Sequence, residues 1–354
     1  LQAIYDPSDL TSLYQSRTGG STGAVDSVVG IMLDKSEMGG KTAAAFIAAQ
    51  SELRSTGAIS TIGAPTLATY NTSTGAGVTN RTDSSNVSGV FIAATTPAWL
   101  IFDIEKTAGA GNLDIRSGNV AGTSILGGTF ITARETRVLY VASGSGAYIT
   151  CASNGGTASF TLHSVKLLPG YHALAPSDAA RPILRSASSK NYLDADGTDD
   201  WMQIFPTLNL GEQWWHVGGW QSDTTGKRAF TRAATYRNGV ISLSANAGWG
   251  TYNAADTTAL LTGAPGVSTP HVLTVEGASS SAMSGRINGA AGASIDPYDL
   301  GASPGLALFT ADNSTYANGL DGRFYGGAFG TGSISSADRA LLERYVASLT
   351  GVSL

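Results

Sequence analysis

The stretch RPILRSASSKNYLDADGTDDW, residues 181–201, decides the fold class of this chain. It reads as an apolar strand, an acidic turn and a second strand, because Asp and Gly tolerate the dihedral angles of tight turns. Short apolar runs separated by Gly, Asn and Ser recur on both sides of this stretch. The pattern predicts an all-β protein.

Composition bounds the number of domains and the classes of function. At 354 residues the chain is longer than a usual single domain, so we expect two domains, each with its own core. The 45 glycines and the charged fraction of 13% favour short strands and tight turns over long amphipathic helices. The net charge of -5 includes no basic cluster, which predicts that nucleic acid is not a partner.

The sequence also bears on membranes and secretion. It contains no apolar run of about 18 residues, so we expect no membrane-spanning helix. The N-terminal residues lack a basic region followed by an apolar one, so we expect no secretion signal and synthesis in a bacterial-type cytoplasm. The single cysteine, Cys151, lies in a strand-like run, where a buried and inert thiol is expected.

Three parts follow one another along the chain. They are an N-terminal segment at 1–55, a first β-domain at 56–170 and a second β-domain at 171–354. Pro169 and Gly170 end the first domain because together they break a strand and favour a turn.

Two local signals mark structure in the second β-domain. The Asn288-Gly289 dipeptide predicts a type I′ hairpin turn. A final helix is predicted between a cap at Ser335 and a stop at Gly351, with one apolar face packed on the domain. That face is predicted to consist of Leu341, Leu342, Tyr345, Val346 and Leu349.

Four phrases of the sequence carry a resemblance to known proteins. They are YDPSDL at 5–10, GIMLDKS at 30–36, VKLLPGYHA at 165–173 and DADGTDDW at 194–201. The last resembles the opening of concanavalin A-like, or laminin-G-like, β-sandwich domains, and the four in this order resemble a family of tailed-phage and prophage virion proteins. The resemblance implies two jelly-roll β-sandwiches: a carbohydrate-binding-module-like one, inserted between the N-terminal segment and a laminin-G-like one with the C-terminal helix.

The resemblance implies a function without catalysis. It implies a virion surface protein of a fibre, a spike or a head decoration that contacts other virion proteins and attaches to bacterial surface polysaccharide. Fibres and spikes are commonly symmetric, so it also implies a homo-oligomer, with a trimer favoured. Two alternatives stay open: a purely structural decoration or adaptor protein without glycan binding, and a polysaccharide depolymerase.

The residues themselves give little support for an enzyme. Asp103 and Glu105 share a strand face, as paired glycosidase carboxylates can, but their surroundings suit an ordinary strand end. The histidines are scattered without metal-ligand spacing, and no Gly-x-Ser-x-Gly motif presents a serine nucleophile. We therefore predict that the protein is not an enzyme.

Asp194, Asp196, Asp199 and Asp200 are the candidate metal ligands. Ca²⁺ is a hard cation that takes carboxylate oxygens from acidic turns, so this segment could hold one. The same residues also suit a turn without metal, because Asp and Gly tolerate its dihedral angles. The sequence leaves both interpretations open.

Trp249 is the candidate platform for a sugar ring, because it is flanked by Gly in the loop-like segment 247–252. Tyr252, Tyr236 and Arg237 are candidate neighbours in the same glycan-binding site. A packing role for Trp249 fits the sequence as well.

Overall fold

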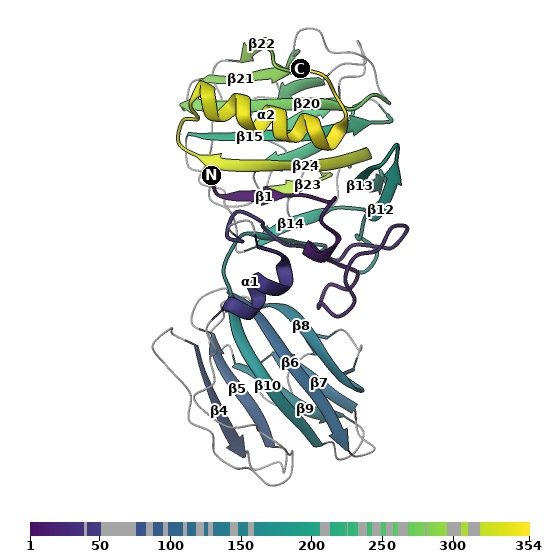
Figure 1. Ribbon diagram of the computed structural model, residues 1–354, viewed down its shortest axis with the longest axis vertical. Coiled ribbons are helices and arrows are strands. Elements are labelled where there is room, and N and C mark those ends of the chain that lie inside the picture. Colours follow the sequence, from purple (N-terminus) through teal and green to yellow (C-terminus); the bar gives the residue numbers. More distant parts are fainter. Residues whose placement is uncertain are drawn as a thin grey trace. The chain divides into compact units, whose positions relative to one another are not determined.

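Figure 1 shows the chain as a computed structural model. The structure describes residues 1–38, 41–50, 76–82, 88–94, 98–108, 112–117, 124–126, 130–141, 148–154, 159–205, 213–224, 226–232, 239–242, 249–252, 258–260, 268–279, 282–295, 306–310 and 319–354. Most of these residues are in β-strands, which form several antiparallel sheets, and a helix lies near the C-terminus. The chain is therefore mostly β.

The chain divides into two compact units. Unit 1 comprises Leu1–Arg17, Ser21–Gly40 and Gly170–Leu354, and unit 2 comprises Thr18–Gly20 and Lys41–Pro169. Gly170 stands at the change between them with a φ of +125°, and a Cβ added there would lie 2.9 Å from the His172 ring. This turn therefore requires glycine.

Unit 1 contains an eight-stranded antiparallel sheet in the order β12-β13-β24-β15-β20-β21-β22, with β1 also paired to β24. The bounds are β1 (Ala3–Tyr5), β12 (Ile183–Ala187), β13 (Lys190–Asp196), β15 (Trp214–Ser222), β20 (His271–Ser279), β21 (Ala282–Ile287), β22 (Ala290–Ile295) and β24 (Asp321–Thr331). Between β21 and β22, Asn288 and Gly289 have φ angles of 48° and 79°. The predicted type I′ turn is confirmed.

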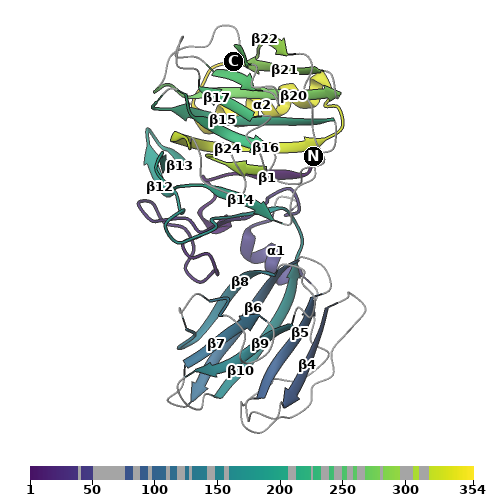
Figure 2. The same ribbon diagram turned by 180° about the vertical axis from the view of Figure 1, so that it is seen from behind.

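Unit 1 also contains a nine-stranded sheet, which faces the eight-stranded one. In Figure 2, which views the molecule from behind, β16 and β17 of this sheet lie in front of β15 and β20. Its order is β19-β18-β17-β16-β23-β14-β11-β3-β2. The bounds are β2 (Leu13–Tyr14), β3 (Ile31–Met32), β11 (His172–Leu174), β14 (Met202–Phe205), β16 (Arg228–Arg232), β17 (Gly239–Ser242), β18 (Trp249–Tyr252), β19 (Thr258–Leu260) and β23 (Leu306–Leu308). A short 3-10 helix, η1 (Leu10–Ser12), precedes β2.

One hydrophobic core lies between these two sheets. Trp214 and Phe324 of the eight-stranded sheet belong to the same cluster of buried side chains as Phe230 and Leu308 of the nine-stranded sheet. Burying an aromatic or aliphatic side chain of this size contributes about 1.5–3 kcal/mol. The neighbour of Trp214 on β15, Trp215, points to the opposite face and is buried there in a second cluster.

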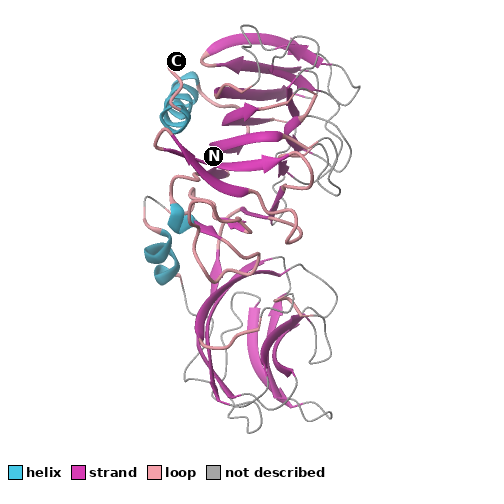
Figure 3. Cartoon of the chain, turned by 90° about the vertical axis from the view of Figure 1, so that its right-hand side faces the viewer, coloured by secondary structure: helices cyan, strands magenta, loops and turns pink. Residues whose placement is uncertain are grey.

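Helix α2 (Ser336–Thr350) packs over this second cluster, on the outer side of the eight-stranded sheet (Figures 1 and 3). Ser335 caps the helix by accepting the amide of Asp338 at 3.0 Å. Gly351 ends it in the left-handed conformation, with a φ of 79°. The predicted start and stop of the helix are confirmed.

The predicted apolar face of α2 is wrong at one position. Leu342, Tyr345 and Val346 pack in the cluster with Trp215, whereas Leu341 is 57% exposed. Neighbouring residues of a helix point about 100° apart, so the sheet contacts the side of Leu342 and leaves Leu341 outside.

Unit 2 contains a three-stranded sheet in the order β10-β6-β8 and a four-stranded sheet in the order β4-β5-β9-β7. The bounds are β4 (Ala76–Thr82), β5 (Ser88–Ala94), β6 (Ala98–Ala108), β7 (Asn112–Ser117), β8 (Arg134–Val141), β9 (Tyr148–Asn154) and β10 (Ser159–Leu168). Leu100, Phe102 and Ile104 alternate along β6 and are fully buried. Helix α1 (Ala43–Ala49) also belongs to this unit.

Candidate functional site

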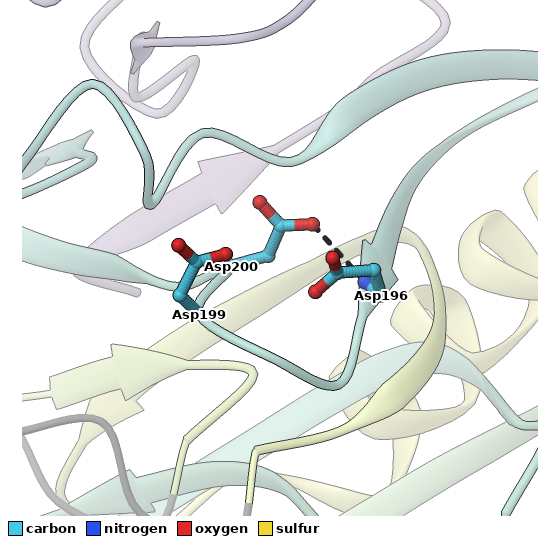
Figure 4. A group of neighbouring side chains, drawn as sticks. All are labelled: Asp196, Asp199 and Asp200. Atoms are coloured by element: carbon cyan, nitrogen blue, oxygen red, sulfur yellow. Dashed lines mark hydrogen bonds between the residues drawn. The ribbon is translucent and has the colours of Figure 1, made fainter.

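The acidic turn between β13 and β14 is held by its own aspartates (Figure 4). The Asp200 carboxylate accepts the backbone amide of Asp196 at 3.0 Å, and the Asp196 carboxylate accepts the amide of Thr198 at 2.7 Å. Gly197 supplies the positive φ, +72°, that the turn needs. The sequence therefore folds this segment as a self-capped turn.

Three of the four predicted metal ligands come together in this turn. Carboxylate oxygens of Asp196, Asp199 and Asp200 all lie within 4.8 Å of one another. Burial, together with the nearby charges of Asp196 and Asp199, raises the pKa of Asp200 to about 7. A hard cation such as Ca²⁺ takes carboxylate oxygens and would favour the ionised form, so these three side chains fit its chemistry.

The fourth predicted ligand, Asp194, faces a different set of groups. Its Oδ2 lies 3.8 Å from Nε of Arg185, and its Oδ1 lies 3.8 Å from Nε of Arg323. Burial raises the pKa of Asp194, and both arginines oppose that rise. Asp194 therefore belongs to the surface beside the turn.

We call this surface the acid–arginine surface. It consists of Arg185, Asp194, Asp223, Asp321 and Arg323. The side chains of Asp194 and Arg323 are 36% and 30% exposed, so the surface is open to solvent. Carboxylates accept hydrogen bonds and guanidinium groups donate them, which together match groups that do both, such as sugar hydroxyls.

Two tyrosines, whose ring planes are tilted by 45° to each other, support the acid–arginine surface. The guanidinium of Arg323 lies 4.7 Å from the ring centre of Tyr192, and that ring lies 5.2 Å from the ring of Tyr325. The Tyr325 hydroxyl donates to Gln221 at 3.2 Å. These contacts fix the position of Arg323. Sequence reasoning missed the surface, because β24 lies far along the chain from β12, β13 and β15.

Trp249 is a core side chain. It is 3% exposed, and its indole nitrogen donates to Nδ1 of His271 at 3.0 Å. The burial of Trp249 fits the packing role, which the sequence had left open as an alternative to sugar binding. Tyr252 ends the same strand, and its backbone pairs with Gly239 of β17 and Thr258 of β19. The other two predicted glycan-binding residues, Tyr236 and Arg237, lie outside the described residues.

The N-terminal segment is fixed to β11 by a junction around Asp34. Its carboxylate accepts the amides of Ile4 at 2.9 Å, Ser36 at 2.8 Å and Tyr171 at 3.0 Å, and its own amide donates to His172 at 2.8 Å. Burial raises the pKa of Asp34, and the amides oppose this. The buried carboxylate thus organises three separate stretches of the chain.

The N-terminal segment is also linked to α2, through Asp6. The Asp6 carboxylate lies 3.3 Å from the Lys35 ammonium and accepts the Tyr345 hydroxyl at 2.8 Å. The Lys35 ammonium also lies 3.0 Å from Asp9. The N-terminal segment is therefore bonded to both β3–β11 and the C-terminal helix.

In unit 2, Asp103 and Glu105 are each paired with a basic side chain of a neighbouring strand. Arg134 binds Asp103 through two nitrogens, at 3.0 and 2.7 Å, and His163 lies 2.8 Å from Glu105. Cross-strand pairs of this kind are typical of the exposed face of a sheet.

Comparisons with known proteins add no family. No protein-family model matches the chain, and no match was found among curated proteins. Among the described helices, none is both long and apolar enough to cross a membrane. The functional interpretation therefore depends on the residues and on the resemblance that they carry.

Proposed function

We propose that this chain is a non-enzymatic structural protein of a phage-like particle, exposed on the virion surface in a fibre, a spike or a head decoration. It attaches the particle to bacterial surface glycans and contacts other virion proteins, as part of a homo-oligomer for which a trimer is favoured. Each of its two units is a jelly-roll β-sandwich: unit 1 is laminin-G-like, and unit 2 is carbohydrate-binding-module-like.

The observation that carries this proposal is the junction around Asp34. Three of the phrases on which the resemblance rests, at 5–10, 30–36 and 165–173, are far apart in the sequence but are bonded to one another here. Asp34 bonds Tyr171, the Tyr5 hydroxyl donates to the Tyr171 carbonyl, and Asp6 pairs with Lys35. A resemblance spread over separate phrases thus corresponds to one physical arrangement, which supports shared architecture.

The jelly-roll architecture is supported by the sheets of unit 1. Two antiparallel sheets enclose one apolar core, as the two layers of a β-sandwich do. Unit 2 also has two antiparallel sheets. The order of the two units along the chain is compatible with an inserted domain, because unit 2 consists mainly of a segment between two parts of unit 1.

For glycan recognition, the acid–arginine surface is the best candidate on unit 1. Its carboxylates and guanidinium groups offer both acceptors and donors, and its side chains are partly exposed. Weak sites of this kind would act together on a particle, because many copies raise avidity without strong individual binding.

Binding to polysaccharide tests the proposal. The purified full chain would be applied to an array of bacterial capsular polysaccharides and lipopolysaccharide O-antigens, and any polymer that binds would then be run with it on size exclusion. Co-elution with unchanged polymer length supports an adhesin. A shortened polymer would instead establish a depolymerase, and failure to bind any polymer recognised by the intact particle would leave the structural adaptor.

A further inference from the structure

The acid–arginine surface has a row of three aspartates along one edge. The neighbouring strands β13, β24 and β15 carry it (Figure 1). On β13, Asp196 lies opposite Asp321 of β24. On the other side of β24, Asp223 directly follows the end of β15, and its amide donates to the Asp321 carbonyl at 2.8 Å. We call Asp196, Asp321 and Asp223 the acidic row. Like charges in such positions destabilise a sheet.

The negative charge of the acidic row is not balanced within the protein. Among the described residues, the Asp321 carboxylate has no hydrogen bond and no ion pair. Burial and the charges of Asp223 and Asp196 raise the pKa of Asp321, and Lys227 opposes this rise without cancelling it. The middle of the row is therefore a carboxylate that lacks a donor.

The arginine side of the surface is not saturated either. Arg185 binds Asp26 at 2.7 Å, but it lies 3.8 Å from Asp194. Nε of Arg323 lies 3.8 Å from Asp194 and 4.0 Å from Asp223, and it has no hydrogen-bond acceptor. Distances of 3.8 Å and more are longer than hydrogen bonds. Asp194 and Arg323 thus lie side by side without a hydrogen bond between these atoms.

We propose that the acid–arginine surface binds glycans that carry a free amino group. The ammonium group of the sugar lies at Asp321, and the neighbouring hydroxyls lie over Asp194 and Arg323. An ammonium has three N–H donors, so it can bond Asp321 and a neighbouring carboxylate at once. Hydroxyls both donate and accept, which matches a carboxylate beside a guanidinium. The inference rests on the proposed function, because it names the class of glycan for the same surface.

The charge of the surface favours this class over acidic glycans. Aspartates outnumber basic side chains by five to three, so a uronate or phosphate group would meet an excess of like charge. The residues counted are Asp26, Asp194, Asp196, Asp223 and Asp321 against Arg185, Lys227 and Arg323. A divalent cation is better suited to the acidic turn, where carboxylate oxygens of three aspartates lie within 4.8 Å of one another.

Three tetrasaccharides with one backbone test the class of glycan. The chitosan tetramer carries amines, the chitin tetramer carries neutral N-acetyl groups, and the N-succinylated tetramer carries carboxylates. Isothermal titration calorimetry compares their binding to the full chain in EDTA at slightly acidic pH, where the amines are protonated. The chitosan tetramer should bind at least about tenfold more tightly than the chitin tetramer, and the succinylated one most weakly. Equal affinities, a reversed order or no binding of the chitosan tetramer overturns the inference.

A matched pair of variants locates the amine. Asp321→Asn should weaken binding of the chitosan tetramer by at least about tenfold, because it removes the carboxylate that accepts the ammonium. It should not lower the melting temperature, because it also removes a charge that its neighbours repel. Asp178→Asn makes the same change of charge at an exposed site outside this surface and should leave binding unchanged. Equal weakening in the two variants would reveal diffuse charge attraction in place of a site.

Arg323→Ala separates recognition of the sugar from attraction of an amine. The variant makes the surface more acidic, so it should bind tetralysine more tightly, whereas it should bind the chitosan tetramer more weakly because the hydroxyls lose a donor. Tighter binding of both probes would show that the surface attracts amines without recognising sugar, and the inference would be wrong. A polymer bound on the polysaccharide array, without a preference for the chitosan tetramer, overturns this inference alone. No binding to any polymer overturns glycan attachment as well.

Discussion

Trp220 donates its indole N–H to Nε2 of His216, 2.9 Å away, inside the core of unit 1. An indole nitrogen can only donate, so Nε2 of this histidine carries no proton. The other ring nitrogen, Nδ1, lies 3.2 Å from the Ala328 carbonyl and is therefore the protonated one. Burial lowers the pKa of His216 to about 3, so the ring is neutral in the folded protein.

Acid is expected to destabilise unit 1 through this histidine. Its folded pKa lies below the ordinary value of 6.5, so the unfolded chain takes up the proton first as the pH falls. The stabilisation is complete above pH 6.5 and is lost progressively toward pH 3, by about 2 kcal/mol between pH 6.5 and 5. NMR of the imidazole and chemical unfolding at several pH values measure this. A His216 ring that titrates near pH 6 in the folded state would contradict it.

The stability of the junction around Asp34 is expected to fall when one carboxylate oxygen of Asp34 is replaced by an amide nitrogen. Asp34→Asn keeps the size of the side chain but places an amide N–H against one of the three backbone donors. We expect a loss of about 1–3 kcal/mol in the free energy of unfolding, measured by urea denaturation. Asp26→Asn is the control, because that exposed aspartate pairs with Arg185 at the surface and should change stability by less than about 1 kcal/mol. Equal losses in the two variants would show that the junction is unimportant.

The sequence correctly predicted the caps and turns that depend only on neighbouring residues. The Ser335 cap, the Gly351 stop and the Asn288-Gly289 turn each depend on residues within a few positions of one another. The three clustered aspartates, Asp196, Asp199 and Asp200, also belong to one turn, so the sequence could bring them together.

Contacts between distant strands could not be predicted in this way. Asp34 bonds residues 30 and 137 positions away, and Arg323 meets Asp194 only because β13 and β24 pair. Trp249 looked like a loop residue because Gly flanks it, yet it begins β18, and its ring is buried beside His271. The exposure of Leu341 depends on which side of α2 the sheet covers. Helical periodicity alone does not decide whether the sheet contacts Leu341 or Leu342.

Calcium binding at the acidic turn is expected to depend on pH. Because the pKa of Asp200 is raised to about 7, its carboxyl group keeps a proton below neutral pH. A cation would have to displace that proton in order to bind. Calcium should therefore raise the melting temperature more at pH 8 than at pH 5, and EDTA should reverse the rise. Asp200→Asn should abolish the response, whereas Asp178→Asn, at an exposed site outside the turn, should keep it. A melting temperature that calcium leaves unchanged at both pH values would favour a turn that needs no metal.

Polysaccharide binding is expected to follow the acid–arginine surface. Arg323→Ala removes the donor that lies over Tyr192, and Asp223→Asn removes a negative charge 4.0 Å from Arg323. Each should weaken binding to a polysaccharide found on the array by at least about tenfold, because losing one good hydrogen-bonding side chain costs on the order of 1.4 kcal/mol. Trp249→Phe should leave binding unchanged, since that ring is buried in the core. Surface plasmon resonance on the immobilised polymer, with melting curves for each variant, measures the difference, and a loss of binding confined to Trp249→Phe would move the site to β18.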